Sequence, residues 1–351
     1  MPQDDSSRYF DGPFLATLPH HPSDDVFLCG SLVEGLGNEH SDFDVYVVTD
    51  AYPRLRDGTF FTGRMCRTLK GEWVFGATLP PDAEVGEVLD LHAVGGRCVH
   101  ITYMARADIA RRFDDIEQRY AGARQDLGDI RDERYDEYGI GDRTMVHKLL
   151  AGRRLHAGAW DGRIGFSELA GKYAYLAYRY HNASWDIALD ISGAWFSGDM
   201  DLCVHFTRRF MEYCAWGFSH LLGFTNTNRK WIVALVKRWP EPHASLARTF
   251  MDLYFGDVRT AQRQQDFVAA ALDWTDRVFA AGVDVQRSTP QAPPPEEWKA
   301  YFLDMFVRIQ DPSALQIREY LWSLRLVQKQ VPASVELLLA RGSENLLSRY
   351  R

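Results

Sequence analysis

Two aspartates, Asp42 and Asp44, stand one residue apart at the start of the apolar segment Val45-Tyr-Val-Val48. Residues two apart on a β-strand point to the same face, so both carboxylates should project together. Two like charges at such close range repel each other unless a cation neutralises them. Mg²⁺ is a hard cation that proteins bind through one or two carboxylates together with the phosphate oxygens of a substrate. The pair therefore predicts a metal site in which Asp42 and Asp44 are both ligands and catalytic residues.

A second motif, Gly30-Ser31, follows directly after the apolar residues 26–29. The pattern predicts a buried strand over 26–29, a turn at Gly30-Ser31 that opens a short helix, and a second strand that carries the aspartates. Glycine lets the backbone come close to a ligand, and the free amides at the start of a helix favour anions. We therefore expect Gly30 and Ser31 to bind the phosphates of a nucleotide beside the metal.

Together these motifs resemble the nucleotidyltransferase signature of the DNA polymerase beta superfamily. The match consists of a strand, Gly30-Ser31, ten intervening residues and then Asp42-Phe43-Asp44. A looser second segment, 190–239, is similar to the helical domain of small bacterial nucleotidyltransferases related to the aminoglycoside-modifying ones. The resemblance covers roughly residues 25–240. It implies an N-terminal domain that holds Mg²⁺ and ATP or another nucleoside triphosphate, and a helical domain that selects the acceptor.

Lys230 is a further candidate for nucleotide binding. It lies near the start of an expected helix over 229–239, which Asn228 or Thr227 could cap. A lysine there adds positive charge to a helix end that already favours anions, which suits a triphosphate. From spacing alone, a solvated lysine beside a core tryptophan is an equally good interpretation. The resemblance favours contact with phosphate, because a Lys-Trp pair in such proteins opens a helix beside the active cleft.

The third carboxylate of the superfamily is missing from its expected position. The resemblance places it on the strand predicted over 96–104, where the residue in the alternating position is His100. Three alternatives follow. His100 is itself the general base, because histidine ordinarily titrates near neutrality. Another acid such as Glu72, Asp90 or Asp190 replaces the missing carboxylate. Or the site binds a nucleotide and metal without transferring anything.

The order of the expected elements predicts an α+β fold, with a mixed sheet and flanking helices followed by an all-helical domain. Further strands are expected over 60–69 and 72–78, and a helix over 105–120. The boundary is placed so that 1–125 form the nucleotidyltransferase domain and 126–351 the helical acceptor-binding domain, with a Pro-rich loop at 288–296. The expected helices of the second half are 143–156, 166–181, 185–196, 202–222, 229–239, 242–255, 258–281, 296–310, 313–330 and 334–347. The basic pairs His147-Lys148 and Arg153-Arg154 in the first of these could form a stripe that faces the cleft, but a solvated face is the favoured interpretation.

Composition narrows the class of protein. The chain has 351 residues and a net charge of −8, which makes a polynucleotide an unexpected partner. There is no apolar run of the ~20 residues that cross a bilayer, and the acidic start Met1-Pro-Gln-Asp-Asp5 is unlike a secretory signal. Five cysteines without a Cys-x-x-Cys pair indicate reduced thiols. We expect a cytoplasmic protein without a membrane segment.

The predicted activity is Mg²⁺-dependent transfer of a nucleoside monophosphate, most simply AMP from ATP, to a hydroxyl of a small-molecule or peptide acceptor. Two alternatives remain open at this point. One is a non-catalytic nucleotide-binding protein that keeps the fold. The other is an enzyme that attaches AMP to a protein, whose acceptor the sequence does not reveal.

Overall fold

The computed structural model describes residues 13–57, 59–94, 97–125, 140–160, 166–182 and 185–349. Contacts divide the chain into two compact units. The first consists of Met1–Glu117 with Gly141–Ala170, and the second of Gln118–Ile140 with Gly171–Arg351. The boundary predicted at 125/126 is thus replaced by a more interleaved division. Residues 141–170 return to the first unit, because a strand within them pairs with β1.

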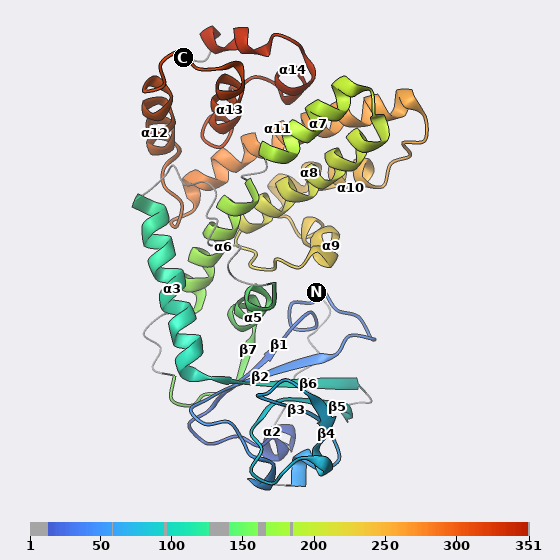
Figure 1. Cartoon of the computed structure of the whole chain (residues 1–351), viewed down its shortest axis with the longest axis vertical. Helices are drawn as coiled ribbons and strands as arrows, with labels where there is room; N and C mark the ends of the chain where they lie inside the picture. The colour runs from blue at the N-terminus through green and yellow to red at the C-terminus, as the bar shows by residue number, and fades with distance from the viewer. Residues whose placement is uncertain are drawn as a thin grey trace. The chain divides into compact units, whose positions relative to one another are not determined.

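A seven-stranded mixed sheet forms the centre of the first unit (Figure 1). The order of its strands is β4-β3-β5-β6-β2-β1-β7. Among the described strands, β2 and β6 run parallel and every other neighbouring pair is antiparallel. The bounds are β1 Asp25–Cys29, β2 Phe43–Thr49, β3 Met65–Thr68, β4 Trp73–Phe75, β5 Val85–Val94, β6 Arg97–Ala105 and β7 Arg153–His156. The predicted mixed sheet is confirmed, and the strands expected over 60–69 and 72–78 contain β3 and β4, which pair antiparallel.

The two faces of this sheet differ in character. One face carries the hydrophobic core, to which β1 contributes Val26 and Leu28, β2 contributes Val45 and Val47, and the short helix α2 (Pro13–Thr17) contributes Phe14. Because side chains alternate along a strand, the residues between them point to the opposite face. That opposite face carries the candidate site.

Two of the differences from the sequence-based prediction concern the sheet. Strand β5 was not predicted, and the helix expected over 143–156 is divided into α5 (Ile140–Ala151) and β7. Gly152 lies at the division, where a Cβ atom would come within 2.8 Å of the Cys29 sulfur and of the Lys148 carbonyl oxygen. The missing side chain therefore lets the chain leave the helix and approach β1 closely enough to pair with it.

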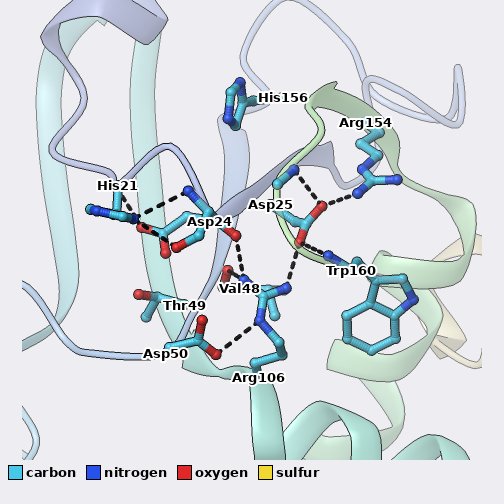
Figure 2. Close-up of polar contacts among 12 residues, drawn as sticks. His21, Asp24, Asp25, Val48, Thr49, Asp50, Arg106, Arg154, His156 and Trp160 are labelled. Atoms are coloured by element: carbon cyan, nitrogen blue, oxygen red, sulfur yellow. Dashed lines mark hydrogen bonds and ion pairs between the residues drawn. The ribbon is translucent and has the colours of Figure 1, made fainter. Parts of the chain in front are cut away.

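A buried carboxylate joins three elements of the first unit (Figure 2). Asp25, whose side chain is fully buried, accepts hydrogen bonds from Arg106 at the start of α3 (Arg106–Gln125) and from Arg154 on β7. It also accepts the backbone amides of Gly158 and Trp160, at 2.9 and 3.1 Å. Burial alone would raise the pKa of Asp25, but these hydrogen bonds outweigh it and lower that pKa.

The described part of the second unit is helical, as predicted (Figure 1). Its long helices α7, α8 and α11 pack together, and Trp274 of α11 is fully buried beside Trp239. The loop 289–294 matches the predicted Pro-rich loop. The bounds are α6 Phe166–Asn182 (which begins in the first unit), α7 Trp185–Ser197, α8 Met200–Leu221, α9 Ile232–Val236, α10 Ala244–Tyr254, α11 Ala261–Ser288, α12 Pro295–Val307, α13 Ala314–Leu324 and α14 Ser334–Leu339.

Candidate functional site

Asp44 is the centre of the candidate site. It lies on β2 between its register partners Cys29 on β1 and His100 on β6, and it is only 7% exposed. One carboxylate oxygen, Oδ2, forms an ion pair with Lys148 Nζ at 2.9 Å. The other, Oδ1, lies 3.9 Å from His100 Nδ1. A nearly buried carboxylate is therefore held between a primary amine and an imidazole.

Asp42 is exposed and lies just before β2, which begins at Phe43. The prediction that Asp42 is a strand residue is therefore wrong. Its charge nevertheless acts in the same region as that of Asp44. Burial raises the pKa of the Cys98 thiol, and the negative charges of Asp42, Asp90 and Asp44 raise that pKa further. A metal site shared by Asp42 and Asp44 stays a prediction.

Gly30 lies directly against the Asp44 carboxylate. Its φ angle is +89°, and a Cβ atom built on it would come within 2.2 Å of Asp44 Oδ2. Glycine is needed here for two reasons: the backbone conformation is rare for residues with a side chain, and the space is occupied by a carboxylate. The neighbour that requires glycine here is thus the Asp44 carboxylate, and the predicted contact of Gly30 with a phosphate stays a prediction.

We expect Gly30→Ala to destabilise the protein by about 1–3 kcal/mol through backbone strain alone and also to displace the Asp44 carboxylate. Gly71→Ala is a matched control, because Gly71 has a φ angle of +98° but its nearest Cβ contact is Arg67 at 3.8 Å. Urea unfolding measures the strain in both variants. Calorimetric titration with MgATP should show a loss of binding for Gly30→Ala only. Equal binding by the two variants would contradict the role given to Gly30.

The predicted short helix after Gly30 is wrong, because residues 31–35 form turns. The backbone amides of Leu36 and Gly37 both donate to the Ser31 carbonyl oxygen, at 2.7 and 2.8 Å. These hydrogen bonds close residues 31–37 into a loop at its C-terminal side. Phosphate binding by Ser31 stays a prediction.

A second contact fixes this loop to α5. The Glu34 carboxylate lies 3.0 Å from His147 Nε2, and the His147 side chain is buried. Lys148, the next residue, reaches Asp44. The expectation that His147 and Lys148 lie on a solvated face is wrong, because α5 packs this end of the helix against the site rather than against water.

His100 occupies the position that the sequence predicts for the third acidic residue. It is the register partner of Asp44 on the parallel strand β6. Its Nε2 atom lies 2.8 Å from Glu87 Oε2 on β5, and Glu87 Oε1 accepts a hydrogen bond from Arg67 at 2.8 Å. The hydrogen bond from His100 lowers the pKa of Glu87 against the opposing effect of burial, and Arg67 lowers it further.

This contact determines which nitrogen of His100 carries a proton. An ionised carboxylate only accepts hydrogen bonds, so Nε2 is the donor to Glu87. In the neutral imidazole, Nδ1 is then an acceptor directed to the side of Asp44. The 3.9 Å separation between Nδ1 and Asp44 Oδ1 leaves both atoms available to a proton-bearing group between strands β2 and β6.

Of the carboxylates proposed as substitutes for the missing acid, two lie in the first unit and one lies in the second. Asp90 follows Leu89, the register partner of His100, so it points to the opposite face, where it pairs with Arg64. Glu72 is exposed in the turn between β3 and β4, and Asp190 is exposed on α7 of the second unit. Glu87 is the carboxylate that contacts His100. Sequence reasoning missed it together with β5, although Val85 and Val88 behind the Pro80-Pro81-Asp82 turn are a strand signal.

Lys230 lies in a single 3₁₀ turn, Arg229–Trp231, that leads into α9. Asn228 caps this turn as predicted, since its Oδ1 atom accepts the Lys230 amide at 3.2 Å. The Lys230 ammonium lies 5.0 Å from the centre of the Trp231 ring. Lys230 belongs to the second unit, and its contact with phosphate stays a prediction.

Comparison of the chain with protein-family models, with curated proteins and with solved structures finds no match. No helix in the described part of the chain combines the length and the apolar character needed to span a bilayer. The fold and the site therefore define the class of this protein. It is an α/β protein with a mixed sheet followed by helices, in which a buried carboxylate, Asp44, lies against the backbone of Gly30.

Proposed function

We propose that this protein is a nucleotidyltransferase that moves a nucleoside monophosphate, most simply AMP from ATP, to an acceptor hydroxyl. The observation that carries the proposal is the position of Asp44. Its carboxylate lies against the side-chain-free Gly30, beside Lys148, and next to a histidine that Glu87 orients. Such a cluster of charged groups at the edge of a loop suits a phosphate substrate and a proton transfer.

The donors fit a hard divalent cation. Carboxylate oxygens are the ligands that Mg²⁺ prefers, and Asp42 and Asp44 would hold it. The described residues contain no group of three or more His, Cys, Asp or Glu side chains arranged to hold a metal ion. Mg²⁺ usually completes its shell with phosphate oxygens and water, so the proposal needs the substrate to supply the remaining ligands. When bound, the ion would neutralise charge on the phosphates.

The other side chains of the site would transfer the proton, stabilise charge on the phosphates and contact the acceptor. His100 Nδ1 accepts the proton of the acceptor hydroxyl, whose oxygen forms a bond to the α-phosphorus. The bond from that phosphorus to the bridging oxygen breaks, and pyrophosphate leaves with the electron pair. Lys148 stabilises negative charge on the phosphates once Asp44 no longer needs it as a counter-ion. The exposed ring of Trp73, 6.0 Å from the His100 ring, offers an apolar wall for a small-molecule or peptide acceptor.

A second candidate is a protein that binds a nucleotide without transferring it. The Lys148–Asp44 ion pair favours this alternative, since an internal cation already neutralises the carboxylate. The two candidates agree on binding and differ in whether pyrophosphate is released.

We expect calorimetric titration to show ATP binding that depends on Mg²⁺ and that is weakened about 10–100-fold in Asp42→Asn/Asp44→Asn, because charge-assisted contacts are lost. The control Asp82→Asn/Asp108→Asn removes the same charge from two other acidic positions, one in the exposed turn before β5 and one on α3. Equal affinity in the wild type and the site variant would reject the site. Mg²⁺-dependent binding without pyrophosphate release, across a panel of hydroxyl-bearing acceptors, would favour the second candidate.

A further inference from the structure

A cavity of about 540 Å³ lies in the first unit, away from the site around Asp44. It is formed where β1 begins and where β2 ends, and its lining includes Asp24, Asp50 and Asp57. The candidate site lies at the other end of the same two strands. Asp50 is six positions after Asp44, which corresponds to about 20 Å along an extended strand. The cavity is therefore a separate feature of the sheet, and its size is within the range of small-molecule pockets.

The charge of this cavity is negative. Three carboxylates line it, and of the described residues in its lining none is lysine or arginine. Arg106 contacts Asp50 at 2.9 Å and donates to the Ser23 carbonyl oxygen, but it is also bound to the buried Asp25 (Figure 2). The Asp57 carboxylate accepts the Arg54 backbone amide at 2.6 Å. His20, His21 and Tyr52 also line the cavity.

Asp24 is the residue that points to a ligand. It is only 4% exposed, and its Oδ2 atom accepts the His21 amide at 2.7 Å. Its other oxygen, Oδ1, has no hydrogen-bond partner among the described residues. A buried carboxylate oxygen without a partner costs free energy, and each such group in a native structure calls for an explanation. Figure 2 shows Asp24 beside His21, Thr49 and Asp50 at this end of the sheet.

We infer that this cavity binds a small organic cation with a primary ammonium group, which donates a hydrogen bond to Asp24 Oδ1. A metal ion fits less well, because the described residues do not assemble three or more metal-ligating side chains. An ammonium supplies both the charge and the N–H donors that the orphaned oxygen lacks. The aromatic ring of Tyr52 in the lining adds a surface suited to cations. The inference does not depend on the proposed nucleotidyltransferase activity.

The test is calorimetric titration of the full-length protein at pH 7 and low salt with 1,4-diaminobutane as the probe. We expect binding by the diamine, little binding by the neutral isostere 1,4-butanediol, and weaker binding by tetramethylammonium, which carries charge without N–H donors. Asp24→Asn should weaken diamine binding about 10–100-fold, as expected for the loss of a charge-assisted hydrogen bond. The control Asp82→Asn removes an exposed carboxylate outside the cavity and should leave binding unchanged.

A second variant distinguishes a loss of binding from a loss of folding. Ala51 lines the cavity and is exposed, so Ala51→Trp should fill it while leaving Asp24 in place. Loss of diamine binding in a folded Ala51→Trp protein would support the inference. Equal binding by the wild type and both cavity variants, or equal binding of tetramethylammonium and the diamine, would overturn it. No detectable binding of the diamine to the wild type would overturn it as well.

Discussion

His100→Ala should transfer nucleotides about 10²–10⁴-fold more slowly than the wild type, while its affinity for MgATP stays nearly unchanged. The reason is the position of the imidazole. Nε2 donates to Glu87, so Nδ1 is the acceptor that faces Asp44 and can take the proton of the acceptor hydroxyl. Rate constants from pyrophosphate release, together with calorimetric ATP affinities, separate a loss of chemistry from a loss of binding. His40→Ala is a matched control, because the His40 side chain is 85% exposed.

Glu87→Gln tests the same arrangement through the neighbour of His100. A glutamine side chain presents either an amide donor or a carbonyl acceptor to Nε2, so it no longer enforces the tautomer that leaves Nδ1 unprotonated. We expect a lower rate constant with little change in ATP affinity. Nitrogen NMR spectra of the imidazole should show a change of tautomer in this variant. A rate equal to that of the wild type in both Glu87→Gln and His100→Ala would contradict the general-base role.

His100→Asp distinguishes the remaining alternative. If a different acid is the base, an aspartate at position 100 should be tolerated or should raise the rate by completing the three-carboxylate arrangement of the superfamily that the sequence resembles. If His100 is the base, this variant should lose rate, because the proton acceptor and its contact with Glu87 are both removed.

Asp25→Ala should lower the free energy of unfolding by about 3 kcal/mol, the scale expected when one partner of a buried ion pair is removed. The Asp25 side chain is fully buried and holds Arg106, Arg154 and two backbone amides. Its loss leaves those donors without their acceptor. Urea unfolding at pH 7 measures the change. Asp50→Ala is the control, because Asp50 contacts the same Arg106 but is 62% exposed, so its loss should cost less than about 1 kcal/mol.

The same carboxylate predicts a dependence on pH. The pKa of Asp25 is lower in the folded protein than its ordinary value, so the folded state favours the ionised form. Its contribution to stability is complete above the unfolded pKa of about 3.9 and is lost as the pH falls through the folded pKa. The stability difference between wild type and Asp25→Ala should therefore be constant near neutrality and shrink below about pH 4. A difference that grew on acidification would contradict this account.

The residues of the candidate site divide into those that the sequence could predict and those that it could not. Asp44 and Gly30 are predicted from local signals, a strand pattern and a glycine between two strands. His100 is singled out by the resemblance, which expects an acidic residue at that position of a neighbouring strand, and the structure shows that this strand is parallel to β2. Glu87 was missed, because Gly86 interrupts the alternation of β5 and the strand was not recognised. Lys148 was assigned to solvent, because the periodicity of a helix does not say which of its faces meets the sheet.

By itself, the sequence determined the mixed sheet followed by helices, and it brought a glycine turn and two aspartates to neighbouring strand ends. Short-range periodicity and turn residues are sufficient for this, because each strand or helix is encoded by its own residues. Only the tertiary structure decided what those residues contact. The return of residues 141–170 to the first unit brings Lys148 to Asp44 and Arg154 to Asp25, more than a hundred residues apart in the chain. Such long-range pairings depend on which faces pack together, and that is a property of the whole fold rather than of any segment.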